Sequence, residues 1–207
     1  MIPQERGGGS ASRPEDPQAG RAPEPAGGGT RMPALFVGHG SPTNAIEDNE
    51  FSRAWADAGK SLPRPRAILC ISAHWETAGT AVTAMKAPKT IHYELGRELQ
   101  GLCSQGILIL GSGNIVHNLG RIVWQDKAYD WALEFDEAIR RLILAGDHEA
   151  IVHYDRLGQA ARLSVPTNEH FLPLLYILAL QGQEDAIGFF TEKVTLGSIS
   201  MRSLRIG

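Results

Sequence analysis

The stretch Leu35-Phe36-Val37-Gly38-His39-Gly40-Ser41-Pro42 decides how this chain is expected to fold. Its first half is apolar, which is typical of a buried strand, and its second half is a glycine-rich turn that carries a histidine. The pattern recurs in Leu69-Cys70-Ile71-Ser72-Ala73-His74-Trp75 and in Ile109-Leu110-Gly111-Ser112-Gly113-Asn114-Ile115-Val116-His117-Asn118. The sequence therefore predicts three buried strands that each lead into a histidine-bearing turn.

Further strand and helix signals follow from the spacing of apolar residues along the rest of the chain. The predicted strands cover residues 34–37, 67–72, 80–85 and 107–110, and strand-like alternation continues over residues 196–206. The predicted helices cover residues 49–59, 93–103, 130–145 and 171–180. Because strands alternate with helices, we expect an α/β fold, with a central, mostly parallel or mixed sheet flanked by layers of helices.

The first 30 residues differ in composition from the rest of the chain. They hold seven of the 23 glycines and five of the 12 prolines, with almost no large apolar side chain. Such a segment cannot bury enough apolar surface to offset the entropy lost on ordering. We therefore expect residues 1–30 to be a disordered Gly/Pro-rich tail, and residues 31–207 to form one metal-binding domain.

The overall charge and hydrophobicity exclude several classes of function. The net charge is −3, which leaves no basic footprint for nucleic acid or an anionic membrane. No apolar run approaches the ~20 residues that a bilayer-spanning helix needs. The tail contains acidic residues, which organellar targeting peptides avoid. We expect a soluble, cytoplasmic protein that binds neither nucleic acid nor membrane.

Two cysteines occur, Cys70 in a predicted strand and Cys103 in a predicted helix. This number does not indicate a disulfide framework, and neither residue belongs to a Cys-x-x-Cys pair that could bind zinc as thiolates. Both are expected to be small buried hydrophobic residues. A metal bound to this chain must therefore rest on imidazole and carboxylate ligands.

Four histidines stand at the ends of predicted strands or helices: His39, His74, His117 and His170. A single histidine is more often a hydrogen-bonded structural residue than a ligand. In α/β sheets, however, side chains beyond the carboxyl ends of the strands converge in one crevice, and imidazole suits zinc and iron. The four positions together therefore predict one metal site.

The segments that carry these histidines also resemble a known family. Gly-His-Gly-Ser-Pro at 38–42, Ser-Ala-His-Trp at 72–75, Ser-Gly-Asn-Ile-Val-His-Asn at 112–118 and Glu-His-Phe-Leu-Pro-Leu-Leu-Tyr at 169–176 look like signature segments of the 4,5-DOPA extradiol dioxygenase family. This family belongs to the class III extradiol ring-cleavage enzymes. The resemblance extends from about residue 32 to residue 207, and the segments occur in the family's order.

The resemblance implies a role for each histidine. His39, His74 and His170 would hold a divalent metal, and His117 would serve as a fourth ligand or as the catalytic acid/base. The implied cofactor is Zn²⁺ or Fe²⁺, and the implied substrates are O₂ and a catechol such as DOPA. Zinc has no redox chemistry, whereas three ligands with open positions suit ferrous iron in oxygenases. Iron is therefore required if the chain cleaves catechols.

His117 is the expected proton carrier. Its unperturbed pKa near ~6.5 would let it accept a phenolic proton and return that proton later in the reaction. Three carboxylates, those of Asp48, Glu94 and Glu169, could orient a ligand imidazole. Glu169, which adjoins His170, is the best of these candidates.

The chain departs from the family near His92. There Thr90-Ile91-His92 passes directly to Tyr93-Glu94-Leu95-Gly96-Arg97, which resembles a family segment that lies far downstream. We expect a central block, with strands of the sheet and a His-Gly-x-Trp motif, to be missing from this chain. Its loss would leave sheet edges unpaired, which predicts a homodimer formed through an exposed edge, or a loss of activity.

Two functions of other classes stay open beside the dioxygenase. A zinc-dependent hydrolase is one, because zinc held by three histidines activates water near neutral pH. A truncated product that binds metal without catalysis is the other. Oxygen uptake on addition of a catechol separates the dioxygenase from both alternatives.

Overall fold

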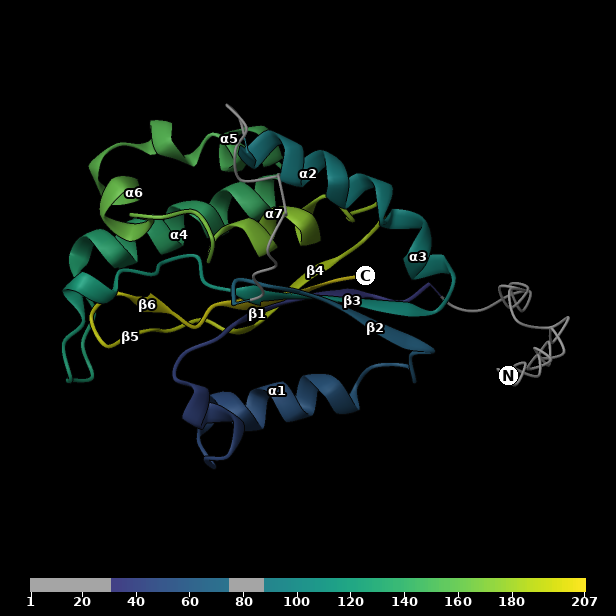
Figure 1. Ribbon diagram of the computed structural model, residues 1–207, viewed down its shortest axis with the longest axis horizontal. Coiled ribbons are helices and arrows are strands. Elements are labelled where there is room, and N and C mark those ends of the chain that lie inside the picture. The colour runs from purple at the N-terminus through teal and green to yellow at the C-terminus, as the bar shows by residue number, and fades with distance from the viewer. Residues whose placement is uncertain (1–30, 75–87) are drawn as a thin grey trace, which may run out of the picture.

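A five-stranded sheet organises the molecule (Figure 1). The computed structural model describes residues 31–74 and 88–207. The strand order is β2 (Ala67–Ser72), β3 (Ile107–Gly113), β1 (Ala34–Gly38), β7 (Ser203–Ile206) and β4 (Ile187–Thr191). β1 and β2 each run parallel to β3, whereas β7 is antiparallel to β1 and β4 is antiparallel to β7. The sheet is mixed, and the predicted layered α/β fold is confirmed.

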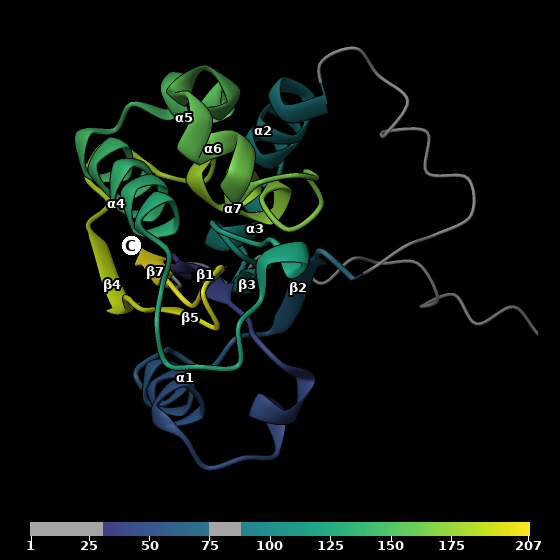
Figure 2. The same ribbon diagram turned by 90° about the vertical axis from the view of Figure 1, so that its left-hand side faces the viewer.

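A thick helical layer covers one face of this sheet (Figures 1 and 2). α7 (Leu172–Leu178) lies directly on β1, β2 and β3, and α2 (Pro88–Glu98) packs on α7. Gly111 permits this contact, because a Cβ atom there would lie 2.7 Å from Cγ1 of Ile177. The rest of the layer consists of α3 (Gln100–Ser104), α4 (Asp130–Ala145), α5 (His148–Val152), η4 (Tyr154–Leu157) and α6 (Gln159–Ser164).

The main hydrophobic core lies between the sheet and this helical layer. The two central strands contribute Phe36 and Ile109, and both side chains are fully buried. α7 contributes four side chains that are 0% exposed: Leu174, Leu175, Ile177 and Leu178. Burying each such side chain stabilises the fold by about 1.5–3 kcal/mol, so this layer supplies much of the driving force for folding.

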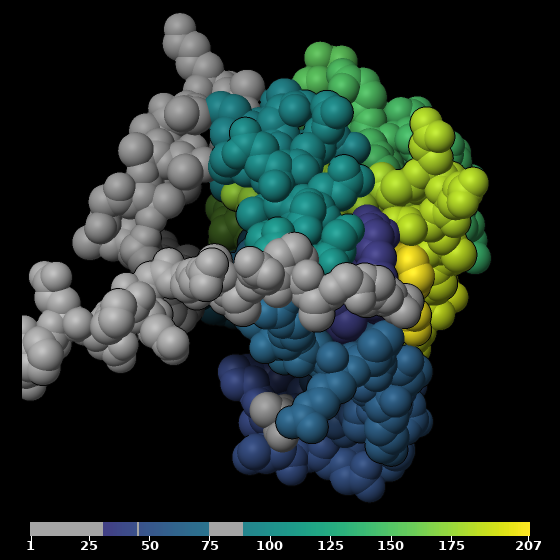
Figure 3. All heavy atoms as spheres, turned by 90° about the vertical axis from the view of Figure 1, so that its right-hand side faces the viewer, coloured from purple at the N-terminus to yellow at the C-terminus, as the bar shows by residue number. Residues whose placement is uncertain are grey.

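The opposite face of the sheet is covered, within the described residues, by α1 (Glu50–Lys60) (Figure 3). The helix begins with a capping box, in which Asn49 accepts hydrogen bonds from the backbone N–H groups of Phe51 and Ser52. None of its residues is fully buried. The buried cluster on this side is small and consists of Met32, Leu35 and Leu108. The two faces of the sheet are therefore covered to very different extents.

Several predicted elements agree with the structure and others differ. The strand at 67–72 and the helix at 130–145 match β2 and α4. The single helix expected over 93–103 is two helices, α2 and α3, which are separated at Leu99. The strand expected over 196–206 is interrupted, because Leu196 and Gly197 have φ values of 50° and 81° that turn the chain between β5 (Val194–Thr195) and β6 (Ile199–Ser200).

The prediction that both cysteines are buried is wrong for one of them. Cys103 is fully buried, whereas Cys70 is exposed. β2 is the last strand at its edge of the described sheet, and Ile68 on it is also 59% exposed. The predicted tail at 1–30 and the predicted strand at 80–85 lie outside the described residues. No helix within residues 31–74 and 88–207 has the length and apolar character needed to cross a bilayer.

Candidate metal centre

The carboxyl ends of three parallel strands meet at one edge of the sheet. The strand register pairs Gly38 of β1 with Gly113 of β3, and Ser72 of β2 with Ser112 of β3. β1 then leads directly into His39, and β2 leads through Ala73 into His74. The two turns therefore project their imidazoles from neighbouring positions, as the strand-to-turn pattern predicts.

His170 reaches the same edge from the segment that precedes α7. Asn114 donates a backbone hydrogen bond of 2.8 Å to the carbonyl of His170, and its side chain also donates to the carbonyl of His39. Gly113 makes this approach possible, because a Cβ atom there would lie 2.2 Å from the His170 carbonyl oxygen. Asn114 thus connects the backbones of two predicted ligands.

Three imidazole nitrogens converge at this edge. The Nε2 atom of His74 lies 3.1 Å from that of His39 and 3.3 Å from that of His170. Ligand nitrogens at ~2.1 Å from one metal ion are expected about 3.0–3.4 Å apart in octahedral or tetrahedral geometry. The donor set and its spacing fit a divalent metal held by three histidines, as the sequence predicts.

The surroundings of His39, His117 and His170 favour the neutral imidazole. Burial, reinforced by neighbouring imidazoles, lowers the pKa of His39, His117 and His170 to about 4. A neutral imidazole retains the lone pair that a metal needs, whereas a protonated one repels the ion. The site is therefore ready to bind a cation at neutral pH.

Two polar side chains orient the ligand imidazoles from outside. The Nδ1 atom of His39 lies 3.0 Å from the hydroxyl of Ser112, and that of His170 lies 3.4 Å from the carboxylate of Glu169. The preference for Glu169 among the carboxylates agrees with this geometry. Asp48 and Glu94 instead pair with arginines, at 2.9 Å and 3.5 Å. Sequence reasoning missed Ser112, although it lies in the Gly-Ser-Gly segment that precedes Asn114.

His117 lies beside the three-histidine group but outside it. Its ring stacks on that of His170, with ring centroids 3.4 Å apart and an interplanar angle of 7°. His117, Glu169 and His170 form a second group of side chains whose ligand atoms are close enough to hold a metal ion. His117 is therefore placed for either of its two predicted roles, fourth ligand or acid/base.

A cavity of about 530 Å³ opens beside these histidines. His39, His74 and His117 line it at one end, and Trp55 of α1 lines it at another. The indole Nε1 atom of Trp55 is buried and has no hydrogen-bond partner within the described residues. The other apolar side chains of the lining are those of Pro42, Leu119, Ile122, Trp124, Leu196 and Ile199, and Gly40, Ser41, Asn44 and Ser112 complete it. The cavity thus combines a largely apolar lining with a few polar groups, which is typical of small-molecule sites.

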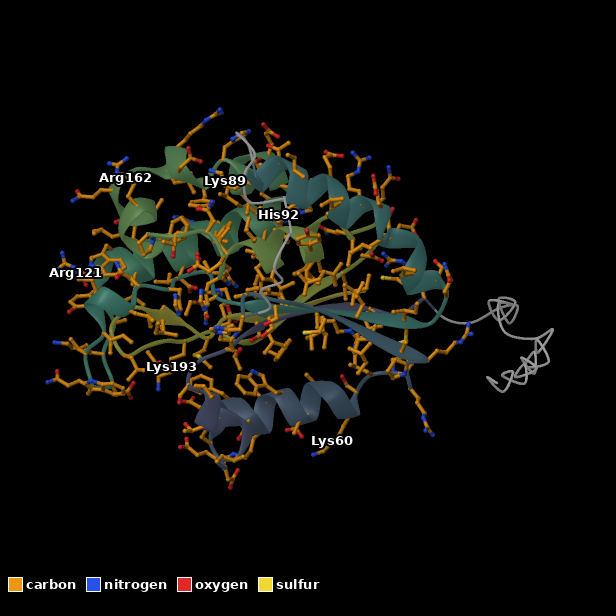
Figure 4. The ribbon with its side chains drawn as sticks, viewed as in Figure 1. Lys60, Lys89, His92, Arg121, Arg162 and Lys193 are labelled. Carbon is orange, nitrogen blue, oxygen red and sulfur yellow. The ribbon has the colours of Figure 1, made fainter. Side chains whose placement is uncertain are left out.

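The other histidines lie away from this cavity. His92, at the junction where the family resemblance is interrupted, shares a 2.8 Å hydrogen bond with Tyr176 and joins α2 to α7 (Figure 4). His148 shares a 2.8 Å hydrogen bond with Tyr93, and His153 pairs with Glu149. None of these three histidines lines the cavity within the described residues.

The fold and the site define an α/β protein with a three-histidine candidate metal centre at the carboxyl edge of its sheet. No family model matches the chain. It is 33% identical to 4,5-DOPA dioxygenase extradiol from Escherichia coli, and the match covers 86% of this chain and 96% of that relative. A relative of the same name from Beta vulgaris is 23% identical over 72% of this chain and 87% of its own length.

A solved structure has the same fold. The crystal structure of an uncharacterised protein from Escherichia coli K12 matches with a TM-score of 0.74 and 29% identity, over 86% of this chain and 100% of that one. The chain belongs to the family of 4,5-DOPA extradiol dioxygenases, which confirms the resemblance found in its motifs.

Proposed function

We propose that this chain is a metal-dependent extradiol ring-cleavage dioxygenase that opens catechols such as DOPA. One observation carries the proposal: the Nε2 atoms of His39, His74 and His170 lie 3.1 and 3.3 Å apart in series, and two of these residues, His39 and His74, line a largely apolar cavity. The names of the relatives support the same reaction class. Ring opening next to the two hydroxyls would place both atoms of O₂ in a semialdehyde product.

The metal that suits this reaction is ferrous iron. His39, His74 and His170 would hold it, with Ser112 and Glu169 orienting two of the rings. Bound iron would supply the redox chemistry with O₂ and the positive charge that makes the catechol hydroxyls more acidic. Zinc in the same position would not support a redox reaction.

His117 would move the protons of the reaction. The pKa of His117 is about 4, below the ~6.5 expected from the sequence, so its imidazole is neutral at pH 7 and a ring nitrogen has a free lone pair. The ring is then a weaker base than an ordinary imidazole, so it would accept a proton from a catechol hydroxyl made more acidic by a bound metal. The stacking on His170 holds the ring at the wall of the cavity. The same nitrogen would return the proton when the ring opens.

The absence of a central block near His92 stays a prediction. The alignment with the Escherichia coli relative extends over 261 residues, which is longer than the 207 residues of this chain, and this supports an internal gap. We propose that the four histidines suffice for metal and substrate binding without the block, because all of them are placed by the described strands and helices.

Metal content and oxygen uptake test the proposal together. The chain is reconstituted anaerobically with Fe²⁺, its metal is measured by elemental analysis, and O₂ consumption is followed after addition of DOPA or 4-methylcatechol. We expect about one iron per chain, and oxygen uptake that is lost together with the metal in His74→Ala. His117→Ala should retain iron but lose at least about 100-fold in turnover.

The matched control is His153→Ala, which removes an imidazole that pairs with Glu149 outside the site. This variant should keep both iron and turnover. Bound metal without oxygen uptake on either catechol would overturn the dioxygenase proposal and favour the hydrolase or the non-catalytic product. Full turnover in His117→Ala would remove His117 from its proton-transfer role.

A further inference from the structure

A second cavity, with charged residues in its lining, adjoins the cavity at the histidines. The second cavity has a volume of about 400 Å³ and shares part of its lining with the first. The shared residues are Gly40, Ser41, Asn44, Trp124 and Leu196. A ring bound near the histidines could therefore place a substituent in the second cavity.

Charged groups line the second cavity, whereas the first is lined by none of the four charged residue types Asp, Glu, Lys and Arg. Six residues line the second cavity and not the first: Phe51, Gln125, Asp126, Lys193, Thr195 and Met201. We call the four polar ones, Gln125, Asp126, Lys193 and Thr195, the charged annex. The annex lies where α1 begins, and Figure 4 shows Lys193 on this side of the molecule. The division separates a site for an apolar ring from a site for a polar substituent.

The ion-pair cluster at the annex carries a net negative charge. Lys193 Nζ lies 3.2 Å from the carboxylate of Asp126 inside the annex and 3.0 Å from that of Glu50, which lines neither cavity. One ammonium thus faces two carboxylates, which leaves one negative charge on the cluster. A positively charged substituent would neutralise that charge, whereas a substituent with only a carboxylate would add to it.

We propose that Asp126 is a specificity-determining residue that accepts a hydrogen bond from an ammonium group on the substituent of the bound ring. The assignment rests on the proposed function, because that function places the ring beside the histidines. Lys193 limits the selectivity by compensating part of the negative charge. The site should favour ammonium-bearing rings over neutral ones, and neutral rings over those that carry only a carboxylate.

The expected effect is modest because the groups are accessible to solvent. The side chains of Asp126 and Lys193 are 77% and 39% exposed. Interactions between exposed charges are screened by water, which corresponds to a preference of about threefold to fivefold in Kd. A difference of this size is measurable by isothermal titration calorimetry.

Three phenols that differ in substituent charge test the proposal. 4-Methylphenol is neutral, tyramine carries an ammonium group and 4-hydroxyphenylacetate carries a carboxylate. None is a catechol, so binding is measured without turnover. The full metal-loaded chain is titrated with each phenol and compared with Asp126→Asn, Lys193→Met and the control Asp57→Asn. Asp57 pairs with Lys60 on α1 and lines neither cavity.

We expect the wild-type chain to bind tyramine about threefold to fivefold more tightly than 4-methylphenol, and 4-hydroxyphenylacetate most weakly. Asp126→Asn should abolish the tyramine preference, Lys193→Met should increase it, and Asp57→Asn should leave it unchanged. An unchanged affinity for 4-methylphenol in each variant would show that the cavity is still folded.

Equal affinities for the three phenols in the wild-type chain, or a tyramine preference that survives Asp126→Asn, would overturn the proposal. Failure of the dioxygenase proposal has a different signature, since it appears as absent oxygen uptake on every catechol. A charge preference that depends on Asp126 would persist in that case. The two proposals can therefore fail separately.

Discussion

The two faces of the sheet differ in how they are held. The face under α7 buries Phe36, Ile109 and a fully enclosed stripe of α7, whereas α1 on the other face buries no residue fully. The metal-site backbone at His170 and Asn114 belongs to the well-packed side. Trp55, which lines the cavity beside the histidines, belongs to the sparsely packed side. The comparison teaches that the well-packed side positions candidate ligand residues, whereas the other side contributes to the cavity wall.

Acidification of the metal-free chain should lower the free energy of unfolding, and this is the largest effect that we expect. The pKa of His39, His117 and His170 is about 4 in the folded chain, below the usual ~6.5 of an unfolded chain. Between these values the unfolded chain binds more protons, so stability falls as the pH falls. We expect a loss of about 1 kcal/mol or more per histidine between pH 7 and pH 5.

Urea unfolding at pH 7, 6 and 5 measures this loss. His117→Gln should reduce the pH dependence, because it removes one of the three titrating groups. A pH dependence that is the same in the wild-type chain and in His117→Gln would contradict the shifted pKa of His117.

A buried ion pair offers the second test. Asp136 of α4 lies 2.6 Å from Arg202, and both side chains are at most 5% exposed. Asp136→Ala would leave the buried guanidinium with a weaker set of partners, which should cost about 3–5 kcal/mol. Asp57→Ala on α1 removes an exposed pair with Lys60 and should cost less than about 0.5 kcal/mol. Equal losses of unfolding free energy in the two variants would contradict the claim that the two sides of the sheet contribute differently to stability.

Truncation of apolar side chains sharpens the comparison further. Leu175 is 0% exposed on α7, and Leu175→Ala should lower the free energy of unfolding by about 2–4 kcal/mol. Leu62 is partly buried on the α1 side, and Leu62→Ala should lower the free energy of unfolding by less than about 1.5 kcal/mol. Chemical denaturation of both variants gives the difference, and a larger loss for Leu62→Ala would contradict it.

The smallest change in the free energy of unfolding is expected for Trp55→Phe. Its buried indole N–H has no partner within residues 31–74 and 88–207, so Trp55→Phe removes a donor without breaking a hydrogen bond there. We expect the free energy of unfolding to change by less than about 0.5 kcal/mol, with a few-fold weaker binding of a ligand that accepts this N–H. Thermal unfolding and calorimetric titration with 4-methylcatechol measure the two quantities, and a destabilisation above 1 kcal/mol would contradict the account.

Local sequence patterns predict those elements and turns whose conformation is determined by residues close by in the sequence. Strand β2, helix α4 and the turns that carry His39 and His74 follow from apolar spacing and glycine placement. The meeting of His39 and His74 also follows, because parallel strands present their carboxyl ends at one edge. The position of His170 depends on how the segment before α7 packs on the sheet.

Features that depend on distant contacts could not be predicted in this way. The exposure of Cys70 depends on what covers the edge strand, and apolar spacing in β2 carries no such information. β4 was not predicted, since its short Ile-Gly-Phe-Phe-Thr sequence is stabilised as a strand by pairing with β7. The role of Ser112 depends on the position of His39, which lies 73 residues away in sequence.

The sparse burial of α1 has a consequence for how the cavity can be redesigned. Substitutions on a helix that buries no side chain fully carry a small penalty in stability, yet this helix supplies Trp55 to the cavity lining. The shape of the cavity can therefore be engineered from α1 while the histidines and the core under α7 stay unchanged.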